Sequence, residues 1–153
     1  MKKILIAGST GNIGSALVDK ISKDPNYKPI ETRRNNLKGD QEYLDLNEKI
    51  TVNFSKYSHL VIAAGITKIK ECEDNEDFSY KINVASTIKL IKNAQDQNCF
   101  IIFLSSNNVF DGKLPNYKFN DETCPNNVYG KHKVLVEEYL QTNYFNNSCI
   151  LRL

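Results

Sequence analysis

A tyrosine and a lysine stand four residues apart in the segment Tyr129-Gly130-Lys131-His132-Lys133. On a helix this spacing places Tyr129 and Lys133 on one face, with Cβ atoms ~5–6 Å apart. A phenol with a pKa of ~10 is a poor proton donor or acceptor at neutral pH, and a neighbouring ammonium that stabilises the phenolate lowers that pKa. The pair could therefore act as a general acid and base. Amphipathic helices also extend lysines along their surface at such positions, so the spacing alone does not decide.

A pair of hydroxyl groups follows the apolar run that we expect to form the fifth strand. Ser105 and Ser106 close this run, at the carboxyl edge where a doubly wound sheet binds its ligand. A hydroxyl group there could hold a substrate carbonyl or alkoxide oxygen for Tyr129. A serine that merely caps the next turn would give the same sequence. Because these groups are expected to converge on one crevice, we predict that one of the two serines, Tyr129 and Lys133 form the catalytic group.

Three glycines, Gly8, Gly11 and Gly14, follow an apolar run and precede a helical pattern. Such a turn binds the diphosphate of a dinucleotide: the first glycine permits a tight turn, the second lets the backbone approach the anion, and the third lets the helix pack closely. The free N–H groups of the helix face the same anion. Read alone, the pattern also fits a turn without a ligand. The candidate cofactor-binding residues in this turn are Gly8, Thr10, Gly11, Asn12, Ile13 and Gly14.

The end of the second predicted strand indicates which dinucleotide binds. A carboxylate there accepts from the ribose 2′-OH of NAD, whereas an arginine meets the 2′-phosphate of NADP. Arg33 and Arg34 favour NADP, although Glu31 is so close that a shift of one position would favour NAD. Both arginines could also be plain surface charges. Asp45 ends the third predicted strand, where it could accept from an adenine amino group or cap the following helix.

Short apolar runs alternate with longer segments that carry apolar residues at helical spacing, which is typical of a parallel α/β sheet. We predict an α/β fold with a Rossmann-like, doubly wound parallel sheet in three layers, with about six strands in the order 3-2-1-4-5-6. The predicted strands are Lys3 to Ala7, Lys28 to Arg33, Glu42 to Leu44, His59 to Ala64, Phe100 to Ser105 and Cys149 to Leu153. The predicted helices are one that carries Ile13 to Ile21, Ile82 to Ala94, Val128 to Tyr144, and a short one within Lys49 to Tyr57.

The composition argues against several classes of function. Lysine plus arginine total 20 and aspartate plus glutamate 18, so the net charge of +2 offers no strong field for binding nucleic acid or an anionic membrane. The longest apolar runs, 60–66 and 99–104, are far shorter than the ~20 residues of a membrane-spanning helix. The first residues resemble a strand more than a signal peptide, so we expect a cytoplasmic protein. Four well-separated cysteines and two histidines predict no metal site and no disulfide framework.

Two blocks of the sequence resemble one enzyme superfamily. Segment 105–112, Ser-Ser-Asn-Asn-Val-Phe-Asp-Gly, is similar to the part of dTDP-4-dehydrorhamnose reductases that ends in Val-Phe-Asp-Gly. Segment 121–133, with Asp-Glu, Pro and Tyr-Gly-x-x-Lys, resembles the corresponding block of the extended short-chain dehydrogenase/reductases that act on nucleotide sugars. The resemblance continues across the chain at Ala63-Ala64-Gly65, Thr67, Glu73, Asn83 and Ile150-Leu151-Arg152.

This resemblance implies an NAD(P)-dependent reductase, epimerase or dehydratase that acts on a nucleotide-linked keto-sugar by hydride transfer. Tyr129 would be the general acid/base, Lys133 would orient the nicotinamide ribose and tune the phenol, and Ser106 would polarise the substrate oxygen. The further cofactor contacts that it implies are Leu46, Ala63, Ala64, Gly65 and Asn83, in addition to Tyr129 and Lys133.

The sequence also departs from that family pattern. Asn107-Asn108 replaces an acidic-aromatic pair, and Lys70-Glu71 alters an acidic stretch, so the exact sugar stays open. Members of this branch are about twice as long, so we expect residues 1–153 to be the NAD(P)-binding domain, with the C-terminal substrate domain absent. A catalytically silent dinucleotide-binding module or sensor is the alternative. The resemblance also implies a homodimer through the helices near 78–97 and 127–145.

Overall fold

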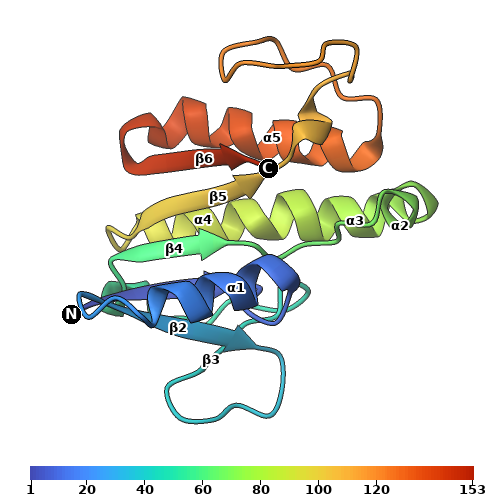
Figure 1. The fold of residues 1–153 in the computed structure, drawn as a ribbon. Coiled ribbons are helices and arrows are strands. Elements are labelled where there is room, and N and C mark those ends of the chain that lie inside the picture. Colours follow the sequence, from blue (N-terminus) through green and yellow to red (C-terminus); the bar gives the residue numbers. More distant parts are fainter.

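The computed structural model describes residues 1–153 and contains one sheet of six parallel strands (Figure 1). The strands lie in the order β3-β2-β1-β4-β5-β6, which confirms the predicted order. Their bounds are β1 (Lys2–Ala7), β2 (Tyr27–Arg33), β3 (Glu42–Tyr43), β4 (His59–Ile62), β5 (Phe100–Ser105) and β6 (Ser148–Arg152). The chain order reverses between β1 and β4, and the carboxyl ends of these neighbouring strands frame the switch point at which such sheets bind ligands.

Helices cover both faces of the sheet and give the predicted three layers (Figure 1). The helices are α1 (Asn12–Ile21), α2 (Ile69–Asp74), α3 (Glu76–Tyr80), α4 (Thr87–Gln95) and α5 (Val128–Tyr144). Leu5 and Ala7 of β1 join the main core with α4 and α5, whereas Ile4 and Ile6 join a smaller cluster with α1. Because successive side chains of a strand point to opposite faces, this apolar strand is buried between the two helical layers.

The predicted helix over 82–94 is the second part of a longer and irregular helical segment. α3 runs into a π-helical stretch, Lys81–Ser86, which continues into α4. π-helical turns are rare and occur mostly at functional sites. Here the stretch carries Asn83, which is buried against the loop that follows β4.

Other differences from the predicted elements are small. α2 has one buried side chain, Cys72, so it lacks the apolar periodicity that would reveal it in the sequence. The helix predicted within 49–57 is reduced to one 3-10 turn, Phe54–Lys56, which Asn53 caps. β4 ends at Ile62, two residues earlier than predicted. No helix of the chain combines the length and the hydropathy that crossing a membrane requires.

Candidate active site

A cavity of about 590 Å³ opens at the carboxyl ends of β1, β2, β3 and β4. This is the edge at which a doubly wound sheet binds its ligand. Most of the predicted cofactor-binding residues line it, namely Gly8, Thr10, Gly11, Arg33, Arg34, Asp45, Leu46, Ala63, Ala64 and Gly65. The predicted residues that do not line it are Asn12, Ile13, Gly14, Asn83, Ser106, Tyr129 and Lys133.

The glycine-rich turn leaves no room for side chains at two of its three glycines. Gly8 has a φ of +87°, and a Cβ atom there would lie 2.6 Å from the backbone nitrogen of Ala64. A Cβ atom on Gly14 would lie 2.1 Å from the carbonyl oxygen of Gly8. A Cβ atom on Gly11 would meet only that same oxygen, at 3.5 Å, and Gly11 lines the cavity. No side chain caps α1, so the N–H groups of its first turn remain available to an anion.

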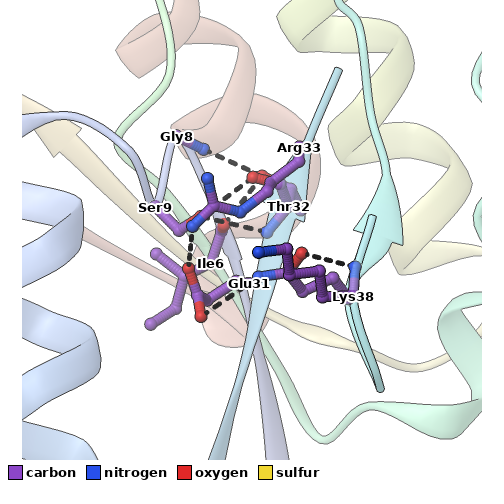
Figure 2. Close-up of polar contacts among 8 residues, drawn as sticks. Ile6, Gly8, Ser9, Glu31, Thr32, Arg33 and Lys38 are labelled. Atoms are coloured by element: carbon purple, nitrogen blue, oxygen red, sulfur yellow. Dashed lines mark hydrogen bonds and ion pairs between the residues drawn. The ribbon is translucent and has the colours of Figure 1, made fainter. Parts of the chain in front are cut away.

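Ser9 and Thr32 fasten this turn to the end of β2 (Figure 2). The Ser9 hydroxyl donates to the Thr32 carbonyl at 2.9 Å and accepts from the Thr32 N–H at 3.1 Å. The Thr32 hydroxyl accepts from the Gly8 N–H at 3.2 Å and donates to the Ile6 carbonyl at 2.9 Å. Both side chains are buried. Sequence reasoning misses this clamp, although Ser9 lies inside the glycine pattern and Thr32 directly precedes the two arginines.

The end of β2 presents arginines to the cavity. Arg33 and Arg34 line the cavity, whereas Glu31 does not. The Glu31 carboxylate is paired with Arg33 Nη2 at 3.1 Å (Figure 2), and it accepts from Gln41 Nε2 at 3.4 Å. Arg33 Nε is buried without a hydrogen-bond partner. Two adjacent arginines that line one cavity suit an anionic ligand.

Two of the predicted cofactor contacts also hold neighbouring backbone. Asp45 Oδ1 accepts from the Asn47 N–H at 2.8 Å within a turn, and Asp45 also lines the cavity. The alternative that Asp45 caps a following helix is wrong, because the next helical turn is Phe54–Lys56 and Asn53 caps it. Asn83 Oδ1 accepts from the Ile66 N–H at 2.7 Å, and Asn83 Nδ2 donates to the Ile66 carbonyl at 2.9 Å. A Cβ atom on Gly65 would lie 2.9 Å from Asn83 Oδ1. Asn83 therefore supports the loop after β4, and Gly65 of that loop lines the cavity.

Ser106, Tyr129 and Lys133 come together beside the carboxyl end of β5. Ser106 follows β5, Tyr129 lies in the first turn of α5, and each keeps 8% of its accessible surface. Burial raises the pKa of the Tyr129 phenol above its usual value, and a hydrogen bond with Ser106 opposes that increase. Lys133 Nζ lies 5.5 Å from the centre of the Tyr129 ring and 4.5 Å from the centre of the Phe103 ring.

The ammonium group of Lys133 is anchored to β5. Its Nζ atom donates to the Leu104 carbonyl at 2.7 Å. Burial lowers the pKa of Lys133 to about 8, and the carboxylate of Glu137, four residues further along α5, opposes the decrease. An ammonium group has three donors, so two remain for the phenol or for a ligand. With this pKa, Lys133 is mostly protonated at neutral pH.

Side chains from two other segments fix the first turn of α5. Asn127 Oδ1 accepts from the Gly130 N–H at 2.8 Å, and Glu73 of α2 accepts from the Val128 N–H at 2.9 Å. A Cβ atom on Gly130 would lie 2.1 Å from the Asn108 carbonyl oxygen, so the turn after β5 packs directly on the helix. Asn127 directly precedes the predicted helix, and asparagine is a preferred N-cap residue, so its capping role has a sequence signal. The sequence gives no signal for the role of Asn108. Glu73 is noticed there only as part of the family resemblance.

Comparison with known proteins agrees with this geometry. The family model described as "RmlD substrate binding domain" matches residues 1–153. The chain belongs to the RmlD substrate binding domain family. The RmlD-type chain is 28% identical over 156 residues to the methionine adenosyltransferase 2 subunit beta of Bos taurus, covering 99% of this chain and 46% of that protein. It is 30% identical over 148 residues to the dTDP-4-dehydrorhamnose reductase of Aggregatibacter actinomycetemcomitans, covering 93% and 48%.

A solved structure extends the comparison to the fold. The dTDP-4-dehydrorhamnose reductase of Yersinia enterocolitica matches the RmlD-type chain with a TM-score of 0.78 and 28% identity. The match covers 99% of this chain and 52% of that one. The chain therefore spans about half the length of the relatives that it matches. The family resemblance inferred from segments 105–112 and 121–133 is confirmed.

Proposed function

We propose that residues 1–153 form the dinucleotide-binding half of an NADP-dependent oxidoreductase that acts on a nucleotide-linked keto-sugar. One observation carries the proposal: an uncapped, glycine-rich helix end and the Ser106, Tyr129 and Lys133 side chains lie at the same carboxyl edge of the sheet. The dTDP-4-dehydrorhamnose reductases among the relatives support the substrate class.

The cavity suits the parts of NADP. The first turn of α1 and the adjoining glycines would hold the diphosphate, because the helix end is uncapped and the glycines present bare backbone. Arg33 and Arg34 would hold the 2′-phosphate, because both arginines line the cavity and guanidinium groups bind phosphate through several N–H donors. Asp45 and Leu46 would flank the adenine. Both arginines line the cavity and Glu31 does not, which supports NADP over NAD.

Three side chains would perform the proton chemistry. The nicotinamide, when bound, supplies a hydride to the carbonyl carbon of the keto-sugar. Tyr129 donates its phenolic proton to the carbonyl oxygen as that oxygen gains charge, which yields the alcohol and a phenolate. Ser106 donates a hydrogen bond to the same oxygen and stabilises its developing charge. The Lys133 ammonium lowers the free energy of the phenolate, and in the reverse direction that phenolate removes the hydroxyl proton.

A binding experiment tests the choice of cofactor. NADPH fluorescence gives its dissociation constant for the chain and for Arg33→Ala/Arg34→Ala. We expect the double variant to bind NADPH at least about 10-fold more weakly, a loss of ~1.4 kcal/mol, and NADH with unchanged affinity. Lys38→Ala is the control, because Lys38 is exposed and does not line the cavity. Tighter binding of NADH than of NADPH by the unaltered chain would contradict the NADP assignment.

A turnover experiment tests the reaction. We expect NADPH oxidation in the presence of dTDP-linked 4-keto-sugars, with kcat at least about 100-fold lower in Tyr129→Phe because the variant lacks the transferable proton. The NADPH dissociation constant of Tyr129→Phe should stay within about twofold of the unaltered value. Interconversion of two sugar epimers without net NADPH oxidation would identify an epimerase instead of a reductase.

A silent module is the second candidate, and one relative favours it. The methionine adenosyltransferase 2 subunit beta of Bos taurus is named as a subunit, so this sequence type also occurs in a protein that works with a partner chain. On this account the cavity binds NADP as a structural or sensory ligand. NADPH binding without turnover, and without any effect of Tyr129→Phe, would favour the module over the enzyme.

We also propose that the protein is a cytoplasmic homodimer that pairs through its helices α3, α4 and α5. Two large apolar side chains, Tyr80 on α3 and Leu135 on α5, support this, because both are exposed and neither lines the cavity. Apolar side chains grouped on helices outside the core favour association. Light scattering tests the proposal, and the mass of a single chain would contradict it.

A further inference from the structure

The hydroxyl oxygen of Ser106 accepts two hydrogen bonds from Asn108. The Asn108 backbone N–H lies 3.2 Å from Ser106 Oγ, and Asn108 Nδ2 lies 3.1 Å from the same atom. A hydroxyl oxygen has two lone pairs, so these two donors occupy its whole accepting capacity. The Ser106 hydroxyl proton must then point to a third group.

The backbone of α5 fixes how the side-chain amides of Asn127 and Asn108 are oriented. The Gly130 N–H can only donate, so the Asn127 atom that it meets at 2.8 Å must be the carbonyl oxygen Oδ1. The other end of the Asn127 amide is therefore Nδ2, which donates to Asn108 Oδ1 at 3.1 Å. By the same logic the Asn108 atom that faces Ser106 is Nδ2. A flipped amide at either asparagine would bring two donors or two acceptors together.

Two side chains beside Ser106, those of Asn107 and Tyr129, offer an acceptor for its proton. Asn107 Oδ1 lies 3.5 Å from Ser106 Oγ, which is long for a hydrogen bond between these groups. Tyr129 is the other partner, and the hydrogen bond from Ser106 acts to lower the pKa of this phenol. The Ser106 proton is thus free for Tyr129 Oη or for an oxygen bound beside it.

We propose that Asn108 is a positioning residue that makes Ser106 an obligate hydrogen-bond donor toward the phenol oxygen of Tyr129. Successive hydrogen bonds connect the start of α5 to the hydroxyl group: the α5 backbone donates to Asn127, Asn127 donates to Asn108, and Asn108 donates to Ser106. The consequence for turnover rests on the proposed function, whereas the effect on Tyr129 does not.

Fluorine NMR of the ligand-free chain tests the effect on Tyr129 alone. The chain is labelled with 3-fluorotyrosine, which brings phenol titration into an accessible pH range, and the Tyr129 resonance is assigned with Tyr129→Phe. Asn108→Leu removes the Nδ2 donor without adding a charge. We expect it to raise the pKa of residue 129 by ~0.5–1, because the Ser106 hydroxyl is then free to rotate away from the phenolate.

A double-mutant cycle shows whether Asn108 acts through Ser106. In the Ser106→Ala background, Asn108→Leu should leave the pKa of residue 129 unchanged within ~0.2. Asn107→Ala is the matched control at the neighbouring exposed position, and it should also leave this pKa unchanged. Equal shifts in both backgrounds, no shift in either, or a shift with Asn107→Ala as large as that with Asn108→Leu would each overturn the proposal. Asn108→Ala serves as the replacement if Asn108→Leu does not fold.

Turnover then connects Asn108 to the reaction. If NADPH-dependent turnover is found, Asn108→Leu should lower kcat about 10-fold with KM within about twofold, and its effect should vanish in the Ser106→Ala background. A change confined to KM would overturn the positioning role in catalysis. Absence of turnover in the unaltered chain would contradict the proposed function and leave the NMR cycle as the test of Asn108.

Discussion

The two helices that begin at the functional edge of the sheet, α1 and α5, start in opposite ways. No side chain caps α1, and the turn that leads into it is built from glycines. Two side-chain acceptors close the start of α5, with Asn127 on the Gly130 N–H and Glu73 on the Val128 N–H. An open helix end keeps its N–H groups and its positive dipole for an anion, whereas a closed end fixes the helix. The difference separates binding at α1 from positioning of Tyr129 at α5.

Both helix starts nevertheless depend on one close backbone contact. A Cβ atom would lie 2.1 Å from a carbonyl oxygen at Gly14 of α1 and at Gly130 of α5. Each contact holds the helix against the turn that follows a strand. The glycines therefore determine how closely each helix packs on the turn that follows a strand. The presence or absence of a cap determines whether the N–H groups of the helix end are free to bind a ligand.

The largest effect is expected at the close contact of α1. Gly14→Ala should lower the free energy of unfolding by about 3 kcal/mol or more. The added methyl group would clash with the backbone carbonyl of Gly8, which cannot move aside as a flexible side chain could. Denaturant unfolding measures the loss of stability. Gly11→Ala is the control and should stay within about 1 kcal/mol of the unaltered chain. Equal stability of Gly14→Ala and the unaltered chain would show that this contact does not shape the turn.

The next effect concerns the buried charge on the closed helix. The pKa of Lys133 falls from 10.5 to about 8 on folding, so between these values the unfolded chain binds more protons than the folded one. Stability from this group therefore increases with pH across that window, by up to about 2 kcal/mol. Unfolding at pH 7.5 and pH 10 should show this increase relative to Lys133→Met. Lys131→Met, at an exposed position on the same helix, should retain the pH dependence of the unaltered chain. Identical pH dependence in Lys133→Met and the unaltered chain would contradict the prediction.

The open end of α1 predicts an effect on binding without an effect on folding. Gly11→Ala places a methyl group on the cavity side of the turn, where only one atom approaches within 4 Å. We expect NADPH to bind at least about 10-fold more weakly, which corresponds to ~1.4 kcal/mol, with an unchanged unfolding midpoint. Fluorescence titration and thermal unfolding of the same sample give both quantities. Unaltered NADPH affinity would place the diphosphate elsewhere.

The smallest effect is expected at the cap that α2 contributes to α5. Glu73→Ala removes the acceptor of the Val128 N–H and should lower the free energy of unfolding by about 0.5–1 kcal/mol. Glu73→Gln retains an acceptor and should lose less. Glu71→Ala, at an exposed position on the same helix, is the control for the loss of a carboxylate. If the Gln and Ala variants are equally destabilised, the cap does not act through this hydrogen bond.

Much of the fold is predictable from local pattern. The alternation of strands and helices predicts a parallel sheet, and the Rossmann-like assignment of that sheet predicts the strand order, which the structure confirms. Irregular elements escape this reasoning. α2 buries only Cys72, and the π-helical stretch Lys81–Ser86 looks like ordinary helix in sequence. Their form depends on what they pack against.

The candidate site divides in the same way. The glycine pattern and the four-residue spacing of Tyr129 and Lys133 are local, so the sequence reveals them. The clamp between Ser9 and Thr32 joins residues 23 positions apart, and the cap from Glu73 to Val128 joins residues 55 positions apart. Such contacts involve common polar residues whose partners are known only after folding.

The sequence by itself determined the parallel α/β architecture, the diphosphate-binding type of turn and the three side chains of the candidate catalytic group. These follow from periodicity, glycine placement and helical spacing, which act over a few residues. The tertiary structure alone decided that Glu31 pairs with Arg33 and does not line the cavity, and that Asn83 supports a loop. It also decided that Asn127 and Asn108 orient the Ser106 hydroxyl. Hydrogen bonds have direction and short range, so their partners are set only when distant segments are packed together.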